Sequence, residues 1–146
     1  MSSPATNPAP VAHLHVHSEH SVLDGACNIK QMAARAAELG MPALSLTDHG
    51  VMNGALDMYK ACRDNDVKPI LGIEAYFVDD RHADKEMSRY ERNHLTLLAE
   101  NDTGFRNLVA MSSEGFLEGY HRGKANIDLE LLDRHAEGVI CLTGCL

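Results

Sequence analysis

Hydrophobic and polar positions alternate along the chain with two periods, one typical of strands and one typical of helices. Short apolar runs bounded by Gly, Pro or Asn predict five strands, at 11–18, 42–47, 68–78, 95–99 and 139–143. Apolar residues three and four positions apart predict helices that follow Asn28, Met52, Asp102 and Asp128. Strands that alternate with helices over short connections indicate a parallel sheet covered by helices.

Helix-end signals support the first of these helices in particular. Asn28 is a good N-cap with Gln31 three residues later, and Gly40 followed by Pro42 ends the pattern. Two polar stretches, 79–93 and 115–125, interrupt the alternation and are expected to be solvated loops. Residues 1–10 are rich in Ser, Pro, Ala and Asn and are expected to be a flexible leader, so that the domain occupies 11–146.

Composition limits the classes of protein that this chain can belong to. It has 146 residues, of which 45% are hydrophobic, and a net charge of -8. Such a chain is expected to fold as one domain, and it does not attract a nucleic-acid backbone unaided. No run of about 18 apolar residues predicts a membrane span, and no signal peptide precedes the domain. The cysteines form no Cys-x-x-Cys pair, which favours a cytoplasmic chain with reduced thiols, and Cys27, Cys62 and Cys141 are interpreted as core residues.

The first predicted strand carries histidines at every second position. His13, His15 and His17 would share one face of an extended strand. Imidazole is the commonest metal ligand in proteins, although a lone His-x-His is more often an exposed polar face. Further residues of ligand type favour a metal site here.

Those residues lie at successive strand ends, where parallel α/β folds bind their ligands. Taken singly, Asp24 could belong to a turn, His49 to a helix entry and Cys145 to the core. Glu74 is harder to explain, because burying a lone carboxylate in an apolar strand costs several kcal/mol. His94 precedes its strand and fits only if that strand runs in the opposite direction. The candidate ligands are His15, His17, Asp24, His49, Glu74, His94 and Cys145.

Seven candidate ligands exceed what one ion needs, since a structural zinc takes about four. A cluster of two or three divalent ions is therefore expected, with Glu74 as a bridge. The mixture of N, O and S ligands suits Zn²⁺ or Mn²⁺, with Fe as an alternative. Adjacent ions of this kind are suited to the hydrolysis of phosphate esters.

The motifs that contain these residues resemble those of the PHP (polymerase and histidinol phosphatase) domain family. Segments 40–44 and 101–108 make the resemblance closest to the version at the N-terminus of the bacterial replicative DNA polymerase III alpha subunit. The resemblance covers about residues 11–146. The motifs that carry it are His13–His17, Ser21–Gly25, Thr47–Gly50, Gly72–Tyr76, His94–Ala99 and Thr143–Cys145.

The resemblance implies an α/β fold, a distorted TIM-like (β/α)7 barrel, of which this chain would hold about five strands and lack the C-terminal part. It implies the same seven ligands, with His13 supporting the site from inside the barrel and Glu74, His15 and His49 as catalytic residues. A later family motif supplies one further Asp and one further His.

The resemblance also implies a function. The full-length protein would be a DNA-directed DNA polymerase, a nucleotidyltransferase of DNA replication. Its PHP domain would be a metal-dependent phosphoesterase that proofreads as a 3′-5′ exonuclease. The alternatives are a catalytically silent scaffold that docks the separate proofreading subunit and, third, a phosphatase of the histidinol phosphate type. DNA would be brought by the polymerase body of the full-length protein. Within this chain, Arg89 and Arg92 could contact phosphate, but they are more simply interpreted as loop residues. The proofreading exonuclease and the sliding clamp are the other expected partners.

Overall fold

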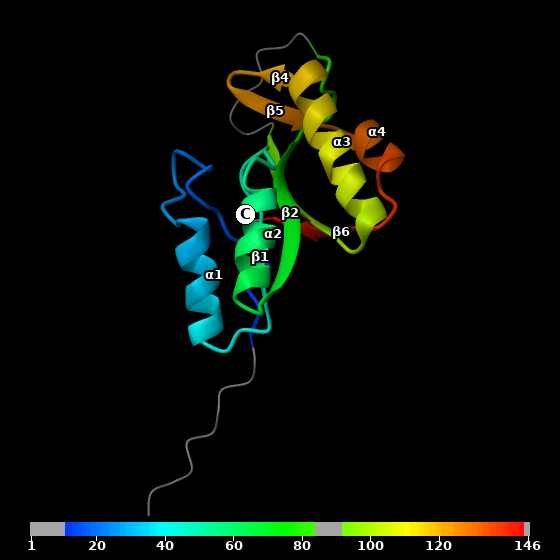
Figure 1. Cartoon of the computed structure of the whole chain (residues 1–146). Helices are drawn as coiled ribbons and strands as arrows, with labels where there is room; N and C mark the ends of the chain where they lie inside the picture. The colour runs from blue at the N-terminus through cyan, green and yellow to red at the C-terminus, as the bar shows by residue number, and fades with distance from the viewer. Residues whose placement is uncertain (1–10, 84–91, 145–146) are drawn as a thin grey trace, which may run out of the picture.

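The computed structural model describes residues 11–83 and 92–144. Four helices and six strands lie within these ranges (Figure 1). The elements are α1 (Ile29–Glu38), β1 (Ala43–Leu46), α2 (Ala55–Asp64), β2 (Lys68–Phe77), β3 (Asn93–Ala99), α3 (Asp102–Glu118), β4 (Tyr120–His121), β5 (Lys124–Ile127), α4 (Leu129–Arg134) and β6 (Val139–Thr143). Strand β3 follows β2, and β5 follows β4, without a helix between them.

The long strand β2 is the centre of a mixed sheet. Its first half pairs in parallel with β1, from Lys68 to Leu71. Its second half pairs antiparallel with β3 and, at its end, in parallel with β5. β6 is antiparallel to β3, and β4 and β5 form a hairpin. The α/β class is confirmed, but the sheet is mixed rather than parallel, and the described residues do not show a closed barrel.

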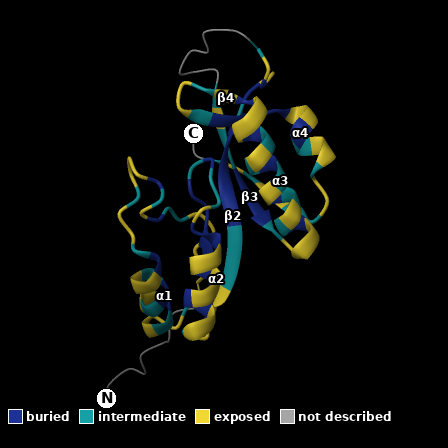
Figure 2. Cartoon of the chain, turned by 45° about the horizontal axis from the view of Figure 1, so that its top comes forward, coloured by how far each residue is buried: buried dark blue, intermediate teal, exposed yellow. Residues whose placement is uncertain are grey.

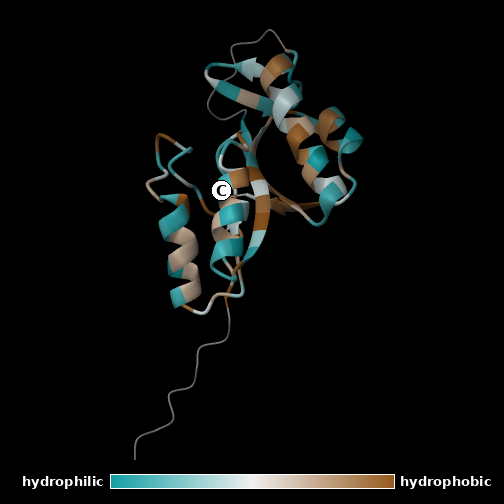
Figure 3. Cartoon of the chain, viewed as in Figure 1, coloured by the Kyte–Doolittle hydropathy of each residue, from teal (hydrophilic) through white to brown (hydrophobic). Residues whose placement is uncertain are grey.

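Two hydrophobic cores flank the two halves of β2. Helices α1 and α2 pack on β1 around the fully buried Met58 and Cys62. Helices α3 and α4 pack on β2 and β3 around Leu97, Leu108 and Leu131. Buried residues accordingly run along β2 and β3 (Figure 2), and apolar segments lie along β2 and on α3 (Figure 3).

Alternation along β2 decides which side chains reach which face of the sheet. Ile73 and Ala75 point into the core beneath α3. Side chains alternate between faces in a strand, so Glu74 and Tyr76 point to the opposite face. The antiparallel register places Thr96 beside Glu74 and His94 beside Tyr76. The antiparallel direction of β3 is what brings His94 to this face, which was the condition for His94 to join the other candidate ligands.

Two expectations about the elements are wrong. Residues 11–18 do not form a regular strand: they make isolated bridges, and Ser45 N and Thr47 N donate to His13 O and Val16 O. The expected loop 115–125 is the end of α3 and the β4–β5 hairpin. Gly119 serves close packing, because a Cβ there would collide with Asn126 O, whereas Gly123 has a φ of +78° in the hairpin turn.

The expected loop 79–93 is described only in part. Arg81 lies within it and is buried, with three acidic side chains around its guanidinium. Residues 84–91, and with them Arg89, lie outside the described ranges, as does the expected leader 1–10.

The cysteines divide between the core and the surface. Cys62 is buried as expected. Cys27 and Cys141 are exposed, which corrects their assignment to the core: Cys27 precedes α1, and Cys141 lies on β6, which pairs with β3 on one side. In the described ranges, no helix is both long and apolar enough for a membrane span.

Candidate metal centre

Five segments meet at the face of the sheet that carries Glu74. His15 and His17 come from the segment that runs beside β1, and Asp24 comes from the turn that follows it. His49 follows β1 and forms an isolated parallel bridge with Glu74 of β2. His94 lies near the start of β3, opposite Tyr76. Strand pairing therefore gathers residues that are up to 79 positions apart in the sequence numbering, from His15 to His94.

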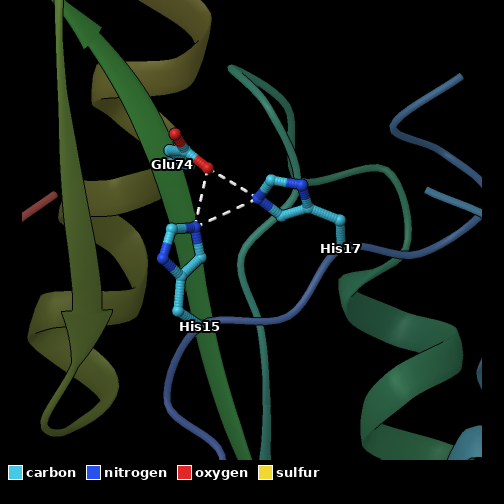
Figure 4. A group of neighbouring side chains, drawn as sticks. All are labelled: His15, His17 and Glu74. Atoms are coloured by element: carbon cyan, nitrogen blue, oxygen red, sulfur yellow. Dashed lines mark hydrogen bonds and ion pairs between the residues drawn. The ribbon is translucent and has the colours of Figure 1, made fainter. Parts of the chain in front are cut away.

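The carboxylate of Glu74 is the centre of the site. Glu74 is 1% exposed, and its Oε2 lies 2.7 Å from His15 Nε2 and 2.6 Å from His17 Nε2 (Figure 4). Its Oε1 lies 2.7 Å from His94 Nδ1. His49 Nδ1 lies 3.6 Å from Oε2. One carboxylate, with about four lone-pair sites on its two oxygens, thus faces four imidazoles.

Asp24 organises a second group beside the first. Its Oδ2 lies 2.9 Å from His49 Nε2 and 3.5 Å from His17 Nδ1. His17 and His49 therefore face Glu74 with one ring nitrogen and Asp24 with the other. Asp24 is the exposed member, since 53% of its side chain is accessible. Two candidate ligand groups, which have His17 in common, therefore lie side by side, as a site for adjacent ions would need.

The distances fit metal ligation. His15 Nε2 and His17 Nε2 are 3.1 Å apart, and both lie within 2.7 Å of the same Glu74 oxygen. Atoms this close can share one ion at the ligand distances of about 2.0–2.1 Å that zinc adopts with histidine. His49 Nδ1 is buried and has no hydrogen-bond partner among the described residues. A buried nitrogen lone pair of this kind fits a divalent ion.

A family comparison assigns the fold that carries this centre. The model of the PHP domain family matches residues 13–146. The chain belongs to the PHP domain family. Its relatives include the DNA polymerase III subunit alpha of Chlamydia muridarum, 46% identical over 135 residues, and that of Treponema pallidum, 46% identical over 136 residues. These alignments cover 91% and 92% of this chain but only 11% and 12% of the relatives, so this chain spans about a tenth of their length.

A solved structure shares the fold of this PHP domain. It is a Bifidobacterium adolescentis protein named as a candidate metal-dependent phosphoesterase, 18% identical in sequence. The TM-score is 0.52, and the superposition covers 74% of this chain and 34% of the other. At this identity the likeness concerns the fold alone.

Electrostatics in the PHP centre favours charged carboxylates and a neutral His94. Burial alone would raise the pKa of Glu74, but the hydrogen bond from His15 and the charges of His49 and His94 outweigh it and lower the pKa. The hydrogen bond from His49 lowers the pKa of Asp24. Burial lowers the pKa of His94, helped by nearby cationic groups and opposed by Glu74. Carboxylates that stay ionised and an imidazole that stays neutral are ready to bind a cation.

Two buried polar residues support the ligands, although the sequence pattern did not single them out. Asp48 accepts hydrogen bonds of 2.7 Å from Ser18 N, Ser18 Oγ and Ser21 Oγ, and so fixes the turn that carries Asp24. Thr96 Oγ1 lies 3.5 Å from His15 Nδ1. In the sequence, the feature that could have pointed to Asp48 is its position directly before the candidate ligand His49, after Ser18 and Ser21.

Tyr76 is the third such residue, and it holds His49 in place. Its ring stacks on the His49 ring with the centroids 5.7 Å apart and 12° between the planes. Gly50 makes this contact possible, because its φ is +64° and a Cβ there would lie 3.2 Å from the Tyr76 ring. Tyr76 therefore fills the space beside the centre.

Of two further residues that were expected at the centre, one lies elsewhere and the other is outside the described ranges. His13 is exposed and lines a surface groove with Gln31 and Arg35 of α1, so it does not support the site from inside a barrel. The reason is that residues 11–18 bend rather than alternate as one strand. Cys145 lies outside the described ranges.

Proposed function

We propose that this chain is the PHP domain of a bacterial DNA polymerase III alpha subunit and acts as a metal-dependent phosphoesterase that removes nucleotides from the 3′ end of DNA. One observation carries the phosphoesterase proposal: a buried carboxylate, Glu74, faces His15, His17, His49 and His94 within 3.6 Å. The relatives named DNA polymerase III subunit alpha support the assignment to DNA.

The ligands divide between two or three divalent ions, for which we propose Zn²⁺ or Mn²⁺, with Fe as the alternative. His15, His17, Glu74 and His94 would hold one group, and His17, Asp24 and His49 the other. Cys145 is proposed as a further ligand from the family motif alone. Bound ions supply Lewis-acid activation of water and positive charge against the leaving oxygen.

The chain's own residues position the reaction. Hydrolysis of the terminal phosphodiester adds water across the bond between phosphorus and the 3′ oxygen. The water oxygen bonds to phosphorus, the 3′ oxygen leaves with a proton, and a nucleoside 5′-monophosphate is released. Glu74 orients His15 and His17 through contacts of 2.7 and 2.6 Å.

The acidic charge of the domain indicates where the DNA comes from. With a net charge of -8, the domain repels a phosphate backbone. We therefore propose that the polymerase body of the full-length protein delivers the 3′ end, and that other replicase subunits, such as the proofreading exonuclease and the sliding clamp, act on the same DNA.

The test is hydrolysis by the chain itself. The protein is loaded with Mn²⁺ or Zn²⁺ and incubated with 3′-labelled single-stranded DNA, with and without chelator. We expect release of labelled mononucleotide that the chelator stops, that Glu74→Gln abolishes, and that Glu100→Gln leaves intact, because Glu100 is an exposed residue at the end of β3.

Two outcomes would contradict the proposal. Tight metal binding without cleavage of DNA would leave a structural domain that docks a partner. Turnover of histidinol phosphate without cleavage of DNA would place the chain with the phosphatases of the family.

A further inference from the structure

A basic group lies on the same sheet face as the metal centre. The register pairs Tyr76 with Asn126 across β2 and β5, and Lys124 is two residues before Asn126. Because side chains two positions apart in a strand share a face, Lys124, Asn126 and Tyr76 lie on the face that carries Glu74. Arg92, directly before β3, reaches over the same face.

Lys124 and Arg92 are held in place around the Tyr76 ring. Lys124 Nζ donates to Tyr76 Oη at 2.8 Å and lies 4.7 Å from the ring centroid. The guanidinium carbon of Arg92 lies 5.8 Å from the same centroid. Arg92 Nε donates to Asn126 Oδ1 at 2.9 Å, and Arg92 Nη2 donates to His121 O at 3.4 Å. Both cations are therefore positioned rather than free to rotate in solvent.

One aromatic ring separates this pair from the metal ligands. The Tyr76 ring stacks on His49 and meets the edge of His94, with centroids 5.7 and 5.1 Å away. A ligand whose phosphate contacts the metal centre can therefore also reach Lys124, which lies on the other side of Tyr76.

The described residues give these cations no acidic partner on this face. Within residues 11–83 and 92–144, no carboxylate lies within ion-pair distance of Lys124 or Arg92, although the chain is strongly acidic. An ammonium has three donors, and Tyr76 Oη takes one of those of Lys124. Two positive charges without a carboxylate partner in the described part of the chain, beside a centre for phosphate chemistry, favour an anionic ligand.

We infer that Lys124 binds the backbone phosphate next to the scissile one, and that Arg92 is a positioning residue that adds positive charge behind it. Lysine is a common point-charge partner of phosphate. The inference rests on the proposed function, because it takes the ligand to be a DNA strand whose 3′ end lies at the metal centre.

The test measures binding as well as turnover. The Mn²⁺-loaded chain is titrated into a 5′-fluorescein oligothymidylate of ten nucleotides, with a phosphorothioate at its last linkage to slow hydrolysis, at several salt concentrations. Lys124→Met keeps the aliphatic stem over Tyr76 but removes the charge. We expect about tenfold weaker binding at low salt, the size of one hydrogen bond to a charged group, and a salt slope reduced by about 0.7.

Three further variants keep the test decisive. Lys124→Arg should retain the salt slope, and Lys60→Met on the exposed face of α2 should bind as the unchanged chain does. Tyr76→Phe keeps the ring on His49 but removes the hydroxyl that holds Lys124. Oligothymidylate binding should weaken less than in Lys124→Met, and its salt slope should stay unchanged. This variant gives a result even if Lys124→Met does not fold.

The outcomes separate this inference from the proposed function. Unchanged affinity and slope in Lys124→Met, in a chain that cleaves DNA, would overturn the role of Lys124 and leave the function. Salt-dependent binding that requires Lys124, in a chain that cleaves nothing, would overturn the function and leave the phosphate site.

Discussion

Two buried carboxylates in this chain are stabilised in different ways. Asp128 is 5% exposed and has a permanent cation beside it, with Arg81 Nη1 2.7 Å from its Oδ1. Glu74 is 1% exposed and has only imidazoles as its close basic neighbours among the described residues. Arginine keeps its charge at all ordinary pH values, whereas imidazole loses it near neutrality. The first site therefore contains its own permanent cation, whereas the second has one only when a metal ion or protons are supplied.

The hydrogen bonds show the same difference. Asp128 also accepts from Arg81 N and, as the N-cap of α4, from Leu131 N. Arg81 further reaches Glu118 at the end of α3 and Glu130 of α4. This cluster ties three segments together and is structural. Each site leaves one buried nitrogen without a hydrogen-bond partner among the described residues, Arg81 Nε in the first and His49 Nδ1 in the second. The difference is chemical, because an imidazole nitrogen can offer a lone pair to a cation and a guanidinium nitrogen cannot.

Removing Arg81 should have the largest effect of any change that tests this contrast. Arg81→Met leaves Asp128 buried without its cation, so the free energy of unfolding should fall by about 3–5 kcal/mol. Urea denaturation measures the loss. Arg63→Met, at an exposed position of α2, should change it by less than about 0.5 kcal/mol. A loss for Arg81→Met as small as that of the control would mean that Asp128 does not depend on its partner.

Glu74→Gln should affect metal binding more than stability. Loss of the shared carboxylate should weaken Mn²⁺ or Zn²⁺ binding by at least about 100-fold, since even outer partners of metal ligands contribute 10–100-fold. The metal-free variant should lose some stability, because the imidazoles lower the pKa of Glu74 and so stabilise its charge in the folded state, but less than Arg81→Met loses, because no buried charge is left without a partner. Titration calorimetry and thermal unfolding measure the two effects. A metal-free variant that loses as much stability as Arg81→Met would show that Glu74 is structural, as Asp128 is.

The increment that metal adds to the free energy of unfolding should therefore depend on Glu74 and not on Arg81. At a free metal concentration 100 times the Kd, binding to the folded state adds about 2.7 kcal/mol. Arg81→Met should show the same increment on its lower baseline, and Glu74→Gln should show almost none. Denaturation with and without chelator measures the increments. Any dependence of the increment on Arg81 would mean that the two regions are coupled.

Lowering the pH should reveal a smaller effect, which is the contribution of ionised Asp128 to the free energy of unfolding. Burial raises the pKa of this carboxyl, but hydrogen bonds from Arg81 and Leu131 outweigh it and hold the pKa below its usual value of 3.8. A lowered pKa in the folded state means that the unfolded chain takes up the proton first. The contribution is therefore complete above about pH 4 and is lost as the pH falls through the folded value.

Asp128→Asn isolates this acid effect, because Glu74, whose pKa is also lowered, titrates in the same range. Denaturation of the metal-free protein between pH 5 and 2 should show a shallower loss of stability in Asp128→Asn than in the unchanged chain. Equal slopes would mean that Asp128 is as accessible to protons when folded as when unfolded.

Much of the candidate centre could be predicted from residue types and their places along the chain. Asp24, His49 and Glu74 follow or occupy apolar segments that are strands, or neighbours of strands, in the structure. Glu74 was the strongest signal, because an apolar run does not bury a carboxylate without a reason. The structure brings these residues together with His15 and His17, while their role as ligands stays a prediction.

The missed features depend on partners that are distant in sequence. Arg81 stands in a stretch crowded with charge, and only the fold places Glu118 and Asp128 around it. Gly119 looks like a turn residue but permits close approach to Asn126. Asp48 looks like part of a motif, although its own hydrogen bonds to Ser18 and Ser21 fix the turn. A local pattern carries no information about such partners.

By itself, the sequence determined the α/β class, the start of α1 at Asn28 and the set of residues able to bind metal, because spacing, caps and side-chain chemistry are local properties. Tertiary structure decided the rest. The antiparallel direction of β3 brings His94 to Glu74, and the pairing of β5 with β2 sets Lys124 against Tyr76. Strand direction and register arise from how whole elements pack, so they alone turned scattered histidines into one centre.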